Sequence, residues 1–95
     1  MAVVLITPDA QAEFNALPKA VRIRVAGVFR RLEQWPSTSG AKPLRGNLAG
    51  RFRIRSGDYR VQFYVERGDA NRRPPAPDIV YVEKVGHRDG FYDDP

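Results

Sequence analysis

Residues 44–65 read LRGNLAGRFRIRSGDYRVQFYV, and their alternation decides the fold expected for the whole chain. In the first half, arginines alternate with Phe52 and Ile54, which is the two-residue period of a strand with one buried and one solvent-facing side. The polar segment 56–58 contains a glycine and predicts a hairpin turn. The alternation resumes in 59–65, which predicts the second strand of the hairpin.

The arginines of this hairpin share one side of the predicted sheet. Antiparallel pairing places Arg51, Arg53 and Arg55 beside Arg60 of the second strand. Alternate residues on one strand lie roughly 7 Å apart, and adjacent strands roughly 5 Å apart. Because guanidinium is a rigid fork of donors suited to phosphate, this side is predicted to bind a polyanion. The alternative is a solvated strand face whose charges discourage aggregation.

The flanking segments complete the prediction of an α+β fold. The apolar run 2–6 predicts a buried strand, and helical spacing predicts a helical hairpin broken at Leu17–Pro18. Residues 36–50 and 67–78 are expected to be irregular, and 79–85 to form the last strand. The N-terminal strand and helical hairpin are therefore expected on one face of a small, largely antiparallel four-stranded sheet. The expected core is Leu5, Phe14, Leu17, Val25, Val28, Leu32, Phe52, Ile54, Val61, Phe63, Val80 and Val82.

Composition restricts the classes of function. The net charge is +5, and only three of the 16 basic residues are lysines, which leaves 13 arginines. Such a chain favours nucleic acid or an acidic protein as partner, although codon bias also enriches arginine. No apolar run is long enough for a membrane span, no signal segment opens the chain, and there is no cysteine. One cytoplasmic domain over 1–95 is expected, without a membrane partner, metal or cofactor.

Several short motifs, taken in order, resemble the RelE/ParE superfamily of toxins from type II toxin–antitoxin modules. The resemblance extends over nearly the whole chain. It is most specific at residues 44–46, 53–55, 57–60 and 86–88 and at Tyr92. It implies a toxin that is neutralised by a cognate antitoxin. That antitoxin is expected to have an acidic segment that becomes ordered on binding over the helices and the sheet.

The resemblance is closest to the RelE-like branch, whose members are ribosome-dependent endoribonucleases that cut mRNA. It implies mRNA and the ribosome, including its rRNA, as partners. By position, the catalytic residues are Arg53, Arg55, Arg60, His87, Arg88 and Tyr92, and the RNA-binding residues are Arg45, Arg51, Arg53 and Arg55. The chain departs from that branch where arginine replaces lysine on the second strand. It also leaves little room before Pro95 for the C-terminal helix of many relatives.

These residue types suit metal-independent attack of a ribose 2′-hydroxyl on the adjacent phosphate. Guanidinium groups stay protonated, so they stabilise the negative charge that develops on phosphorus and do not act as bases. His87 exchanges a proton near neutral pH, and Tyr92 is a candidate base or a ring that stacks on RNA. Which of the two moves the proton is left open. We expect all of these side chains to converge on one face.

Two other functions fit the same resemblance. The ParE-like branch inhibits DNA gyrase without cleaving nucleic acid, and an inactive toxin relic would keep the fold alone. A basic face serves both RNA binding and protein binding, so the sequence does not separate these functions. Cleavage of translated message and inhibition of supercoiling would distinguish them.

Overall fold

The computed structural model describes residues 1–91, which form an α+β fold with two α-helices and a five-stranded mixed sheet. The sheet order is β1-β5-β4-β3-β2; β1 is parallel to β5 and the other neighbours are antiparallel. The elements are β1 Val3–Ile6, α1 Pro8–Asn15, α2 Lys19–Leu32, β2 Lys42–Pro43, the 3-10 turn η1 Gly46–Leu48, β3 Arg51–Ser56, β4 Tyr59–Glu66 and β5 Ile79–His87.

The expected α+β class is confirmed, but the expected four strands are wrong in number. The additional strand, β2, contains two residues, and its partners on β3 are Arg53 and Phe52. So short a segment has no alternation to detect, and its proline suits only a sheet edge. The parallel pairing of β1 with β5 also makes the sheet mixed.

The helical hairpin forms for local reasons. Thr7 caps α1, because its Oγ1 accepts the Ala10 N–H at 3.2 Å, and Pro8 occupies the first helical position. After the break, Arg22 Nη1 donates to the carbonyl of Asn15, the last residue of α1, at 3.4 Å and to the Leu17 carbonyl at 2.8 Å. The buried stripe of α2 then faces the sheet, and it consists of Val21, Val25, Val28 and Leu32.

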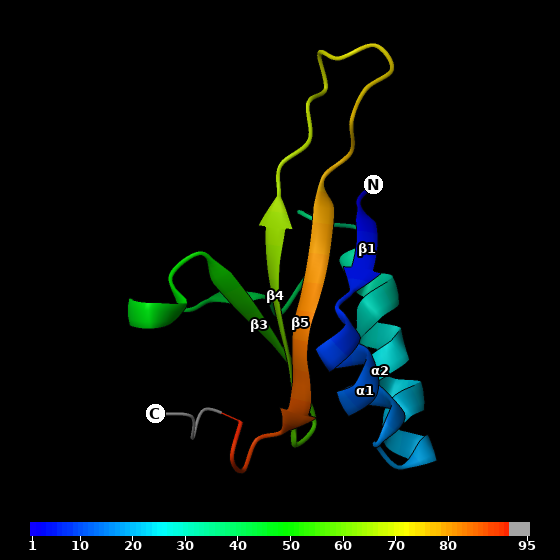
Figure 1. The fold of residues 1–95 in the computed structure, drawn as a ribbon, viewed down its shortest axis with the longest axis vertical. Helices are drawn as coiled ribbons and strands as arrows, with labels where there is room; N and C mark the ends of the chain where they lie inside the picture. The colour runs from blue at the N-terminus through cyan, green and yellow to red at the C-terminus, as the bar shows by residue number, and fades with distance from the viewer. Residues whose placement is uncertain (92–95) are drawn as a thin grey trace.

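Both helices cover the same face of the sheet (Figure 1). Between the layers lie eight of the predicted core residues, all buried: Val25, Val28, Leu32, Ile54, Val61, Phe63, Val80 and Val82. Phe14, Leu17 and Phe52 are only partly buried and pack against this core. Trp35, just after α2, packs edge-on against Phe52 and Phe63, with ring centroids 4.9 and 5.5 Å away.

The prediction of Leu5 as a core residue, and of 2–6 as a wholly buried strand, is wrong. Leu5 is 45% exposed and Val3 is 44% exposed, whereas Val4 and Ile6 pack against the core. The reason is that β1 is the outermost strand on its side and the helices cover only one face of the sheet. A run of apolar residues does not show which of the two faces is covered.

The turn between β3 and β4 is tighter than the segment 56–58 implied. Ser56 pairs with Tyr59, so the loop has only two residues, Gly57 and Asp58. Gly57 has φ +60°, a value that suits glycine at the first position of a two-residue hairpin turn. At the other end of β4, the connection to β5 extends well beyond the sheet (Figure 1). An isolated bridge between Asp69 and Ala76 holds that connection together.

Candidate nucleic-acid interface

The register of the sheet places four arginines on the side that the helices leave open. Arg51, Arg53 and Arg55 of β3 lie opposite Tyr64, Gln62 and Arg60 of β4, respectively. The intervening residues, such as Ile54 and Val61, are buried on the helix side. We call the open side at Arg51, Arg53, Arg55 and Arg60 the arginine face. The register thus places these four arginines on one side of the sheet, as the sequence predicted.

Arg55 and Arg60 are direct cross-strand partners near the hairpin turn. Arg55 is exposed, whereas Arg60 is 9% exposed and its Nη1 donates to the carbonyls of Gly57 and Tyr59 at 3.4 and 3.3 Å. The pair brings two guanidinium groups, which are rigid forks of donors suited to phosphate oxygens, to this end of the sheet.

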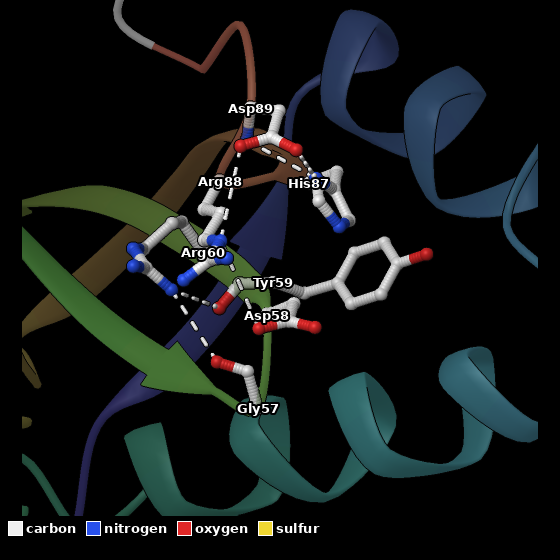
Figure 2. Close-up of polar contacts among 7 residues, drawn as sticks. All are labelled: Gly57, Asp58, Tyr59, Arg60, His87, Arg88 and Asp89. Atoms are coloured by element: carbon white, nitrogen blue, oxygen red, sulfur yellow. Dashed lines mark hydrogen bonds and ion pairs between the residues drawn. The ribbon is translucent and has the colours of Figure 1, made fainter.

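Arg88 lies at the same end of the sheet, beside the turn between β3 and β4. Its N–H donates to the Asp58 carbonyl at 2.7 Å, and its Nε is 3.8 Å from carboxylate oxygens of both Asp58 and Asp89. Figure 2 shows Arg88 next to Arg60, with Asp58 and Asp89 on either side of its guanidinium. All of these groups are solvent-accessible, so the two ion pairs compete only weakly with a phosphate.

His87 does not share the arginine face, so the expected convergence of its imidazole with the guanidinium groups is wrong in this structure. Its cross-strand partner is Tyr59, and the two rings meet edge-on with centroids 5.2 Å apart. Tyr59 packs against the core on the helix side, whereas the next residue, Arg60, points to the other side (Figure 2). The reason is the alternation of β5, in which Gly86 and not His87 is opposite Arg60.

The ring of His87 is held in one orientation. The Asp89 N–H donates to His87 Nδ1 at 3.1 Å, so in the neutral imidazole the proton is on Nε2. Asp89 Oδ2 is also 3.5 Å from Nδ1 and would pair with a protonated ring. These contacts connect His87 to Asp89, in the segment that carries Arg88.

Tyr92 lies outside the described residues, which end at Phe91 on the arginine face. Phe91 is 2% exposed and packs against Gly86, where an added Cβ would lie 3.3 Å from the phenyl ring. Lys84 of β5 contacts this segment twice. Its Nζ donates to the Phe91 carbonyl and lies 4.6 Å from the centroid of the Phe91 ring. Sequence analysis missed both residues, because the contact depends on the chain reversing after β5.

A bulge in β5 brings further polar groups to the arginine face. Gln62 pairs with Lys84 and Phe63 with Val82, so Glu83 is the extra residue. Glu83 Oε2 accepts hydrogen bonds from Arg51 Nε and Gln62 Nε2, both at 3.0 Å. The sequence contains a sign of this bulge. Strict alternation from Val82 would turn residue 84 toward the core, yet residue 84 is a lysine.

Arg45, predicted to bind RNA, is exposed and directly precedes η1, between β2 and β3. In residues 1–91 no group of three His, Cys, Asp or Glu side chains is arranged to hold a metal ion. No helix in the same part of the chain has the length and apolar character needed to cross a membrane.

The fold is similar to the fold of RelE-like toxins. A chain of the RelBE2 toxin–antitoxin complex from Mycobacterium tuberculosis superposes with a TM-score of 0.71 at 29% identity, over 90% of this chain and 96% of that chain. A chain of the RelB–RelE complex from Methanococcus jannaschii has a TM-score of 0.67 at 20% identity, over 94% of this chain and 95% of that chain. A conserved hypothetical protein from Helicobacter pylori has a TM-score of 0.63 at 15% identity, over 94% of this chain and 97% of that chain.

No family model and no curated protein matches the sequence. The structural matches nevertheless confirm the RelE-like toxin fold that the motifs predicted.

Proposed function

We propose that this protein is the toxin of a type II toxin–antitoxin module and that it cleaves mRNA on the ribosome. The observation that carries the proposal is the arginine face, which lies on the uncovered side of a RelE-like fold. Two of the similar structures are toxin–antitoxin complexes, which supports the toxin assignment. A basic, open sheet face suits a phosphate backbone because its guanidinium groups are fixed donors for phosphate oxygens.

In this proposal Arg53, Arg55 and Arg60 bind the scissile phosphate and stabilise the charge that develops on it as the 2′-hydroxyl attacks. Arg45 and Arg51 contact neighbouring phosphates, and Arg88 extends the cationic surface past the turn. Because His87 lies on the helix side, we assign proton transfer to Tyr92, the other candidate from the sequence. His87 keeps the Arg88 segment in place.

The first experiment is a bacterial translation reaction with added protein. We expect new 5′ ends in a translated message and none in a matched message without a start codon, because the ribosome presents the RNA. DNA supercoiling by gyrase should proceed normally in a parallel assay. Intact message with blocked supercoiling would support a gyrase inhibitor instead, and an effect on neither would indicate an inactive relic.

The proposal includes an antitoxin that covers the edge of the sheet at β1. Val3 and Leu5 are exposed there, on an outermost strand whose backbone edge can accept an added strand. An acidic antitoxin segment would complement the net charge of +5.

Replacing Leu5 by lysine should weaken the complex with the co-expressed antitoxin by about tenfold or more, although it adds an attractive charge. Lysine on an edge strand opposes further strand pairing, and the substitution removes an apolar contact. Binding can be measured by calorimetry. The matched control is Ile23→Lys on α2, where the side chain is 62% exposed and the charge change is the same. Weakening by Ile23→Lys alone would place the interface on the helices.

A further inference from the structure

Two stacked tyrosines lie on the open side of the sheet, next to the arginine face. Tyr64 of β4 and Tyr81 of β5 are cross-strand partners whose ring centroids are 5.0 Å apart, with an angle of 19° between the rings. Both side chains are partly exposed. The helices cover the opposite face, so this aromatic pair is not part of the core between the layers.

The tyrosine pair is continuous with the cationic surface. Arg51 is the β3 partner of Tyr64, and its guanidinium carbon lies 5.2 Å from the centre of the Tyr64 ring. Tyr64 is thus held between Arg51 on one side and Tyr81 on the other. On the side away from Tyr64, the register partner of Tyr81 is Leu5 of β1.

We propose that Tyr81, supported by Tyr64, stacks on one base of single-stranded RNA. The proposal rests on the RNA-binding function proposed above and adds a base subsite to it. Stacking rings beside fixed cations are the combination by which proteins hold unpaired nucleotides. The charge of the adjoining arginine face favours RNA over a neutral or basic peptide as the occupant.

The test measures the affinity of the whole protein for a short fluorescent 2′-O-methyl RNA, which has no 2′-hydroxyl to attack. Tyr81→Ala should weaken binding by about tenfold, whereas Tyr81→Phe, which keeps the ring, should bind as wild type does. The salt dependence should be the same in wild type and Tyr81→Ala, because no cation is removed. Arg53→Ala should instead reduce the salt dependence.

A second readout ties the effect to one base. In a series of RNAs with one abasic position each, one position should weaken wild-type binding about tenfold and leave Tyr81→Ala unaffected. A folded Tyr81→Leu variant with wild-type affinity, or equal abasic effects in both proteins, would overturn the subsite.

The outcomes also separate the two levels of the proposal. If the tyrosine variants bind RNA normally and Arg53→Ala does not, the basic face binds RNA but the base subsite is wrong. If Tyr81→Ala affects only antitoxin binding, the aromatic pair is a protein interface and the subsite is again wrong. If the wild-type protein does not bind RNA, both the subsite and the proposed function fail.

Discussion

Replacing Arg60 by alanine is expected to lower the rate of mRNA cleavage by about a hundredfold or more. Arg60 is the most buried arginine of the arginine face, and its guanidinium is held by carbonyls of the turn at Gly57 and Tyr59. A cation fixed in this way needs little reorganisation when charge develops on the phosphate, which is why its loss should affect the reaction more than binding. Single-turnover primer extension in a translation extract measures the effect.

Two controls isolate this contribution. Arg30→Ala removes the same charge from an exposed position on α2 and should cleave at the wild-type rate. Arg60→Lys keeps the charge but loses the fork, so its rate should lie between those of wild type and Arg60→Ala. Because Arg60 is buried, the melting temperature of each variant must be compared with that of wild type. Wild-type cleavage by a folded Arg60→Ala variant would contradict the proposed role.

The hairpin could be predicted from sequence because both of its strands follow one simple rule. Alternation assigned Phe52, Ile54, Val61 and Phe63 to one side and the arginines to the other, and the register bears this out. Alternation gives no prediction for a very short strand or for a strand made of apolar residues only. It could not detect β2, which has two residues, nor decide which face of β1 is covered by helices.

The candidate site was harder to predict because it depends on the order of the strands and on one inserted residue. The bulge at Glu83 reverses the alternation of β5, so Lys84 faces the arginines and Val85 faces the core. His87 consequently lies on the side of Tyr59. Spacing along the chain placed His87 close to Arg88 but did not show which face of the sheet it would occupy.

The largest effect on stability is expected at Phe63, which is fully buried between the sheet and α2. Its ring stacks on Phe52 with centroids 5.5 Å apart and meets Trp35 edge-on at the same distance. Phe63→Ala should therefore lower the free energy of unfolding by about 3–5 kcal/mol, from lost burial and from the cavity that remains. The total free energy of unfolding of a small domain is only about 5–15 kcal/mol, so this variant should be close to unfolding at 37 °C.

Urea denaturation followed by the fluorescence of Trp35 measures this change, because Trp35 reports on the same aromatic cluster. The control Ile23→Ala removes an apolar side chain that is 62% exposed on α2, and its effect should stay within about 0.5 kcal/mol. Phe63→Leu fills most of the space left by the phenyl ring, so it should lower the free energy of unfolding less than Phe63→Ala does. Equal midpoints for Phe63→Ala and wild type would mean that this aromatic cluster is not the centre of the core, and the packing that positions the arginine face would have to be reassigned.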